Sequence, residues 1–174
     1  MKKIIVIMFL LFSMLYNVFG QQNSPVTKRD GKEQKSLEEK IIMEKIGKLL
    51  TDTAFMFNAT DMMVRGGGNV DLSYTCDVQV KIEIVKSYLP FMGKAYYVST
   101  DTDIKNSGFD FTLPLQDYYF KKNKSGYNAV LKVKNGTDLL NYRFYITKTG
   151  SATLTVGSSR RQSISFYGSI SELN

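Results

Sequence analysis

One segment of the chain places apolar residues at helical spacing. Ser36 begins it, and Glu39 three residues later completes a capping box, which typically starts a helix. The apolar stripe that follows consists of Leu37, Ile41, Ile42, Ile46, Leu49 and Leu50. We predict an amphipathic helix from Ser36 to near Thr53. Because acidic residues share its polar face, packing on a sheet is favoured over lying on a membrane.

After residue 54 the period changes from helical to two. Tyr74, Cys76, Val78, Val80, Ile82 and Ile84 occupy every second position, with a polar residue between each two of them. This is the pattern of a half-buried strand, but it is too long for one strand, so a turn or bulge should interrupt it. Similar alternation predicts further strands at residues 55–59, 95–99, 108–113, 116–121, 127–133, 140–146, 152–156 and 164–167.

The turns between these segments are short. Asn135-Gly136 favours a type I′ hairpin, and Thr149-Gly150 turns the chain again. Strands joined so closely must be antiparallel neighbours, because a parallel pair needs a long crossover. We therefore predict a mainly β (α+β) fold. Its form is a curved antiparallel meander or barrel of about 8–10 strands with one N-terminal amphipathic helix packed on it. The alternative is a two-layer β-sandwich.

The N-terminus has the features of a secretory signal peptide. Lys2 and Lys3 precede an apolar run, and Gly20 precedes polar Gln21. The run is shorter than the roughly 20 residues of a spanning helix. We expect a signal peptide at residues 1–20, a flexible polar leader at 21–35 and a single β-rich domain at 36–174. The mature protein would be exported to the periplasm or cell surface, with no membrane span.

Composition excludes several kinds of site. The chain has no His and one Cys, so it cannot form a His-based triad, a His-ligated zinc site or an internal disulfide. We expect no metal and no cofactor, and we expect Cys76 to be a buried core residue. The 23 basic and 16 acidic residues are interspersed, which argues against nucleic-acid binding. The net positive charge instead suits anionic cell-surface glycans or lipid headgroups.

Aromatic residues and carboxylates are the remaining candidate chemistry. There are 11 Tyr and 11 Phe, and consecutive aromatics such as Tyr118-Tyr119-Phe120 must alternate between the two faces of a strand. Some rings must therefore lie on the outer face or line a cavity, where they suit glycan, lipid or protein ligands or pair across strands. Asp77, Glu83, Asp110 and Asp117 could supply a hydrolase pair, although sequence does not place any two together.

Two segments resemble those of a secreted family of Bacteroidota. Residues 87–96, SYLPFMGKAY, are similar to its segment S-Y-L-P-[YF]-x-G-[RK]-A-Y. Residues 158–168, SSRRQSISFYG, resemble its closing segment S-x-R-Q-x-I-[ST]-[YF]-x-G. The family is domain of unknown function 4251, and the resemblance covers about residues 37–172. It implies an exported periplasmic or surface protein and supplies no activity.

If the two segments share a site, its candidate ligand-binding residues are Tyr88, Lys94, Tyr96, Arg161 and Gln162. They would recognise a ligand and not catalyse a reaction. Arg160 and Arg161 together could also bind an anionic group, or lie in a solvated turn. The structural alternative is that Arg161 holds a barrel end by bonding backbone carbonyls.

These observations favour a non-enzymatic binding module at the cell envelope, with an unidentified lipid, glycan or protein ligand. One alternative is an envelope structural or assembly partner that acts through an exposed strand edge or aromatic patch. A carboxylate-based hydrolase is the third hypothesis, and the sequence offers no motif for it.

Overall fold

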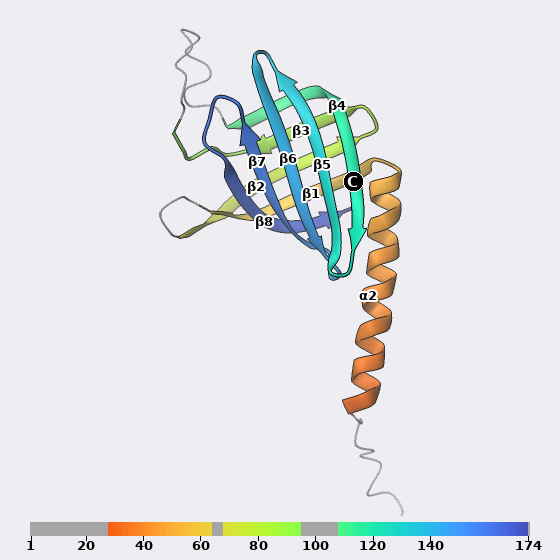
Figure 1. Cartoon of the computed structure of the whole chain (residues 1–174). Coiled ribbons are helices and arrows are strands. Elements are labelled where there is room, and N and C mark those ends of the chain that lie inside the picture. The colour runs from red at the N-terminus through yellow and green to blue at the C-terminus, as the bar shows by residue number, and fades with distance from the viewer. Residues whose placement is uncertain (1–27, 64–67, 95–107, 174) are drawn as a thin grey trace, which may run out of the picture. The chain divides into compact units, whose positions relative to one another are not determined.

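A computed structural model of the chain describes residues 28–63, 68–94 and 108–173. In these segments the chain forms one α-helix and eight β-strands (Figure 1). Their bounds are α2 Lys28–Thr51, β1 Ala54–Met63, β2 Asn69–Lys81, β3 Ile84–Leu89, β4 Phe109–Asn123, β5 Gly126–Asn135, β6 Asp138–Thr147, β7 Ser151–Ser158 and β8 Ile164–Ser171.

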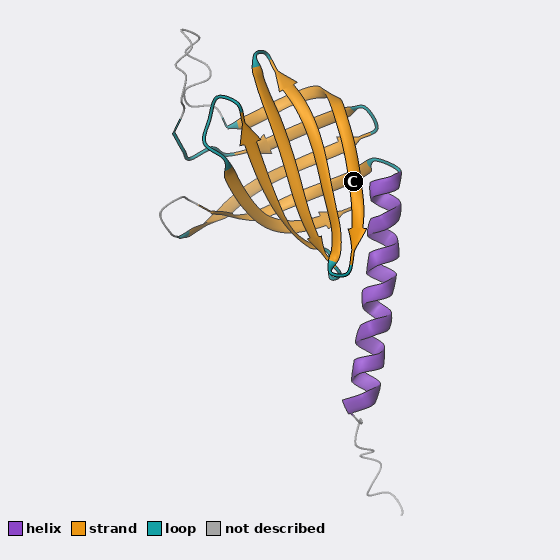
Figure 2. Cartoon of the chain, in the orientation of Figure 1, coloured by secondary structure: helices purple, strands orange, loops and turns teal. Residues whose placement is uncertain are grey.

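The eight described strands form a closed antiparallel barrel in sequence order (Figure 2). Each strand pairs with the next, and β1 closes the barrel by pairing with β8. The predicted meander is therefore confirmed in its barrel form, and the sandwich alternative is wrong. The long alternating segment is interrupted, as predicted, by a turn at Ile82 and Glu83 between β2 and β3. The strand predicted at residues 95–99 lies outside the described residues.

The β4 strand differs from the prediction because it runs through Pro114. The sequence predicts two strands, 108–113 and 116–121, whereas the structure has one strand of 15 residues. Its first half, up to Pro114, pairs with β3, and its second half, from Leu115, pairs with β5. A register shift between Leu115 and Asp117 follows directly. Proline is tolerated here because it lies at the end of the β3 ladder, where the pairing partner changes.

The predicted hairpin at Asn135-Gly136 forms with its turn one residue later. Asn135 is the last residue of β5, and Gly136 and Thr137 make the turn. Gly136 has a φ of 59°, while Thr137 is not among the positive-φ residues. A type I′ turn requires positive φ at both central residues, so that assignment is wrong although the hairpin is confirmed.

The barrel interior is filled by side chains. Inward positions of β5 to β8 alternate with outward ones, and the fully buried residues include Leu131, Tyr142, Leu154 and Phe166. Cys76 belongs to this cluster, as expected, and burial raises the pKa of its thiol. A raised pKa disfavours the reactive thiolate, so Cys76 acts as a small apolar core residue.

The helix begins at Lys28, eight positions before the predicted start at Ser36. Ser36 lies inside it, and its Oγ donates a hydrogen bond to the carbonyl of Glu33 at 3.1 Å, so the predicted capping box is wrong. The helix also covers residues 28–35, which the sequence assigns to a flexible leader. The chain divides into two units after Leu37, at a position within the range of α2. None of the described helical residues forms a segment long and apolar enough to cross a membrane.

Within the second unit, the helix packs its apolar side into the barrel core. Met43, Ile46 and Leu50 are buried, whereas Ile41 is exposed, as is Leu37 earlier in the helix. The predicted stripe was therefore wrong at Leu37 and Ile41, and it omitted Met43. The observed stripe keeps the spacing of three and four residues that helix packing requires.

Two ends of the barrel are used below. The helix end is where β1, β3, β5 and β7 begin, and its turns are short. The loop end is where β2, β4, β6 and β8 begin, and the segments before β4 and β8 are longer. At the helix end, the Tyr127 hydroxyl donates to the carbonyl of Met43 at 3.1 Å, and the Tyr118 hydroxyl donates to that of Leu50 at 2.9 Å.

Candidate functional site

The loop end brings together the two segments that carry the family resemblance. The backbone N–H of Gln162 donates to the carbonyl of Lys94 at 2.9 Å. The amide nitrogen of Lys94 lies 3.5 Å from Gln162 Oε1. Residues 68 positions apart in the sequence are therefore tied side by side, just beyond β3 and just before β8.

Arg161 is buried at this end and not displayed to solvent. Only 5% of its surface is exposed, and its Nε lies 3.7 Å from Asp138 Oδ2. Its guanidinium carbon lies 5.3 Å from the centre of the Phe91 ring and 5.0 Å from that of Phe109. Planar guanidinium groups bind well to aromatic faces and carboxylates. In this environment Arg161 closes the loop end, where its partners include a carboxylate and two aromatic rings. We call Arg161, Asp138, Phe91 and Phe109 together the plug.

Asp138, the carboxylate facing Arg161, is held by the end of β7 and the loop that follows it. Its oxygens accept hydrogen bonds from the hydroxyls of Ser158 and Ser159 at 2.8 to 2.9 Å, and from the backbone N–H of Ser159 at 3.0 Å. Several donors thus compensate a buried charge, which would otherwise be costly. The Ser158-Ser159 pair therefore fixes the loop that carries Arg161 and Gln162.

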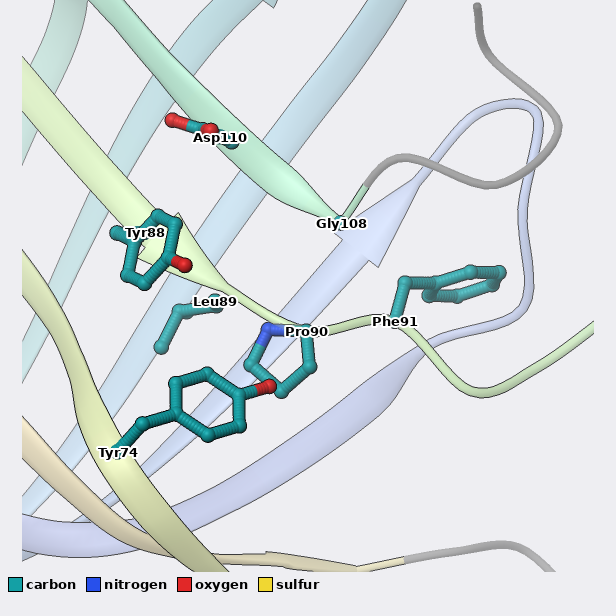
Figure 3. A pocket seen from close by; sticks show the side chains of 7 residues that line it. All are labelled: Tyr74, Tyr88, Leu89, Pro90, Phe91, Gly108 and Asp110. Atoms are coloured by element: carbon teal, nitrogen blue, oxygen red, sulfur yellow. The ribbon is translucent and has the colours of Figure 1, made fainter.

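An open pocket of about 300 Å³ lies beside this plug (Figure 3). Its lining residues are Tyr74, Tyr88, Leu89, Pro90, Phe91, Gly108 and Asp110. The two tyrosines are 53% and 46% exposed, and their rings meet edge to face at 6.3 Å. Figure 3 shows Tyr88 coming from β3 and Tyr74 from the neighbouring strand β2. Large exposed aromatics around a hollow are typical of ligand sites.

A bulge in β2 produces the position of Tyr74. Ala59 of β1 pairs with Cys76, but Asp61 pairs with Asp71, so Leu72 to Thr75 of β2 stand opposite Thr60 alone. Tyr74 has the same parity as the buried Cys76 and would point inward in a regular strand. Bulges re-aim side chains. This one leaves Tyr74 against the ring of Tyr88.

Backbone packing shapes the opposite wall of the pocket. A side chain on Gly108 would overlap the carbonyl oxygen of Leu89, so the two chain segments approach closely only because residue 108 is glycine. Tyr88 and Asp110 are directly paired across β3 and β4. The pocket therefore has two phenol groups and one carboxylate at its rim, and its lining residues include no Lys or Arg.

The Tyr74 phenol stays protonated at neutral pH. Partial desolvation raises its pKa, and Cys76 and Tyr88 shift it in the same direction. A protonated phenol can donate a hydrogen bond as well as accept one. The rim can consequently bind polar hydroxyl groups while its rings contact an apolar surface.

Comparison with known proteins agrees with the resemblance seen in the sequence. Residues 38–170 match the family described as Domain of unknown function (DUF4251). The chain belongs to the DUF4251 family. A crystal structure of a DUF4251 family protein from Bacteroides eggerthii DSM 20697 has the same fold, with a TM-score of 0.60 and 17% sequence identity. The similarity covers 76% of this chain and 88% of that one. No curated protein matches the chain.

The sequence-predicted residues of this DUF4251 domain have different surroundings. Tyr88 lines the pocket, Lys94 is exposed, and Gln162 is half-buried beside Lys94. Arg161 is buried in the plug. Tyr96 is outside the described residues. Sequence reasoning missed Tyr74, because its period-two position indicates an inward side chain and a bulge leaves no mark on the period.

The carboxylates proposed for hydrolysis are dispersed. Asp110 lines the pocket, whereas Asp117 forms an ion pair with Lys132 at 2.8 Å, which lowers the pKa of its carboxyl group. Asp77 is buried and accepts a hydrogen bond from Gln79 at 2.8 Å. Among the described residues, no group of three His, Cys, Asp or Glu side chains could hold a metal ion.

Proposed function

We propose that this DUF4251 protein is an exported, non-enzymatic module that binds a neutral glycan in the loop-end pocket. The observation that carries the proposal is the pair of exposed tyrosines, Tyr74 and Tyr88, around an open hollow with Asp110 at its rim. Aromatic faces contact the C–H faces of sugars, and phenol and carboxylate oxygens accept hydrogen bonds from sugar hydroxyls.

The size of the pocket and the packed barrel interior favour a glycan over a lipid as the ligand. An internal lipid site would need space inside the barrel, but the core there is packed from Leu50 and Phe55 at the helix end to Phe109 at the loop end. The pocket is instead open to solvent, and its volume suits one or two sugar rings. Its polar rim also suits hydroxyl groups better than an acyl chain.

The pocket supports binding better than hydrolysis. Glycoside hydrolysis uses two carboxyl groups that flank the scissile bond. In the described lining, Asp110 is the one carboxylate, while Asp117 is engaged with Lys132 on another part of the barrel. A single carboxylate beside two aromatic rings is suited to recognition.

Export is part of the proposal and is supported by the first 20 residues. A positive start, an apolar run and a small residue before Gln21 are the features of a secretory signal. The protein would therefore meet its glycan in the periplasm or at the cell surface. Detection of a mature chain beginning at Gln21 in an envelope fraction would test this step.

The binding proposal is tested with an array of neutral oligosaccharides and calorimetry on any that bind. Tyr88→Ala should weaken binding at least about fivefold, since a stacked ring contributes about 1 kcal/mol or more. Asp110→Asn should weaken it by a smaller factor. Tyr119→Ala is the matched control, because Tyr119 is also exposed, at 56%, but lies outside the pocket lining. Equal losses in Tyr88→Ala and Tyr119→Ala, or no bound oligosaccharide, would contradict the proposal.

A further inference from the structure

The outer face of strands β4 to β7 is strongly basic. Residues 115–158 are all described, and their outward positions and turns carry six cations, Lys121, Lys124, Lys132, Lys134, Arg143 and Lys148. The one acidic side chain on this face is Asp117, which pairs with Lys132. We call this surface the basic face. Its strands stand at the front of the barrel in Figure 1.

Most of the net charge of the chain is concentrated on this face. It holds six of the 23 basic residues but only one of the 16 acidic residues, so the rest of the sequence is close to neutral. The other two charged residues of the segment are not part of it. The Nζ of Lys122 lies 5.9 Å from the centre of the ring of the buried Tyr127, and Asp138 is buried against Arg161. A local excess of one sign attracts ligands of the opposite sign.

The cations are arranged as a strip and not as a point. Lys132 and Lys134 lie near the loop end of β5, and Lys124 and Lys148 lie in the two turns at the helix end. The ten residues of β5 span roughly 30 Å at about 3.3 Å per residue. Such a strip is complementary to an extended polyanion and larger than one small anion requires.

A tyrosine is held in place within the strip. Tyr145 is 45% exposed, and its hydroxyl donates to Ser125 Oγ at 3.0 Å. Ser125 Oγ in turn donates to Asn123 Oδ1 at 2.8 Å. Across the sheet Tyr145 pairs with Asn128, which pairs with Lys121. A fixed aromatic ring, an amide and a lysine thus lie in one row.

We propose that the basic face binds an acidic polysaccharide, with the lysines and Arg143 on its carboxylate or sulfate groups and the Tyr145 ring on a sugar face. This second surface is independent of the loop-end pocket. A membrane is less well matched, because the two helix-end turns of the basic face, residues 124–125 and 148–150, carry no apolar side chain that could insert among lipids. Nucleic acid would need an intracellular location, which the N-terminal signal features argue against.

The test uses the mature protein and four polyanions: oligogalacturonate, poly-glutamate of similar charge, duplex DNA and phosphatidylglycerol vesicles. The variant Lys121→Gln/Lys134→Gln/Arg143→Gln removes three charges from the basic face. The control Lys40→Gln/Lys81→Gln/Lys86→Gln removes three exposed charges elsewhere. We expect the face variant to bind oligogalacturonate about tenfold more weakly or worse, and the control to lose less than about twofold.

Tyr145→Ala separates sugar recognition from general charge attraction. It should weaken oligogalacturonate binding several-fold and leave poly-glutamate binding unchanged, because only the sugar has a face to stack on the ring. Tyr88→Ala should affect neither polymer. The proposal is overturned by equal losses in the face and control variants, by an unchanged Tyr145→Ala, or by tighter binding of poly-glutamate, DNA or vesicles than of oligogalacturonate. Circular dichroism confirms that each variant is folded.

Discussion

The two ends of the barrel are closed by different chemistry. At the helix end, Met43, Ile46 and Leu50 extend the apolar core, and two tyrosine hydroxyls fasten the helix by donating to its carbonyls. At the loop end, the closing group is a charge, Arg161, held between Asp138 and the rings of Phe91 and Phe109. The first end is sealed mainly by hydrophobic burial and the second by a compensated ion pair.

The exposed ligand-contacting groups lie beside the end that Arg161 closes. Tyr88 occupies an outward position of β3, and the bulge in β2 brings Tyr74 against it. Both rings therefore remain at the surface while Arg161 is buried next to them. The loop end therefore combines a rigid floor with an exposed aromatic rim. The comparison predicts that changes at the floor should alter stability, whereas changes at the rim should alter binding.

The largest effect is expected from Arg161→Ala. It leaves Asp138 buried without its cation, and breaking a buried pair in this way costs about 3 to 5 kcal/mol of unfolding free energy. Urea unfolding measures the loss. Arg160→Ala is the matched control, because the side chain of Arg160 is partly exposed. Its removal should lower the free energy of unfolding by less than about 1 kcal/mol. Similar losses in the two variants would show that the plug does not stabilise the loop end.

At the helix end, Leu50→Ala should cost about 3 kcal/mol, because it removes a fully buried side chain and leaves a cavity. Ile41→Ala on the same helix should change the unfolding free energy by less than about 0.5 kcal/mol, since Ile41 is exposed. The same denaturant experiment compares the two variants. If Ile41→Ala were as costly as Leu50→Ala, the assignment of the packed side of α2 would be incorrect.

Alkaline pH should destabilise the barrel through two tyrosines, one at the helix end and one in the barrel core. Burial raises the pKa of Tyr118 at the helix end and of Tyr142, whose hydroxyl donates to Ser87 at 3.1 Å. Above the unfolded value of about 10, the unfolded chain has lost a proton that each folded phenol still holds. Stability therefore falls as pH rises, by up to about 1.4 kcal/mol per pH unit for each group.

Replacing one of these tyrosines separates their contributions to this pH dependence. Tyr118→Phe and Tyr142→Phe should each lower stability at neutral pH by about 1 kcal/mol, through the lost hydrogen bond. Each should also make the decline above pH 10 shallower than in the unsubstituted protein. Unfolding titrations between about pH 8 and 11 measure both quantities. A decline as steep in Tyr118→Phe as in the parent would mean that its phenol is not protected from ionisation.

The barrel was predictable because its determinants are local. Alternation in residues 127–133 and 140–146 and the glycine turns between strands require antiparallel neighbours whatever the rest of the chain does. The start of the helix was not predictable in this way. Residues 28–35 are polar and lack an apolar stripe, so the spacing of apolar residues does not indicate a helix there. The motif at Ser36 resembles a helix cap but lies within the helix.

The site was only partly predictable because its determinants are distant in sequence. The family resemblance led to Tyr88, Lys94 and Gln162, which the structure gathers at the loop end. The burial of Arg161 depends on Asp138, a residue of another strand, and no local pattern links the two. The exposed position of Tyr74 depends on the bulge in β2 where that strand pairs with β1. Contacts across strands, and not propensity, decide which of these side chains reach solvent.

The smallest effect, about 1 kcal/mol, is expected at Gly47 and tests how closely the helix is fitted to its end. Alanine normally stabilises a helix by about 1 kcal/mol relative to glycine. Here a methyl group would lie 2.5 Å from the hydroxyl oxygen of Tyr127, which is buried and bonded to Met43. Overpacking and the strained hydrogen bond should outweigh the gain, so Gly47→Ala should destabilise the protein by about 1 kcal/mol.

In a Tyr127→Phe background the obstructing oxygen is gone, and Gly47→Ala should become neutral or stabilising. A destabilisation of the same size in both backgrounds would show that the Tyr127 hydroxyl does not determine how closely the helix fits. The contrast between an apolar helix end and a charged loop end would then not hold at the helix end.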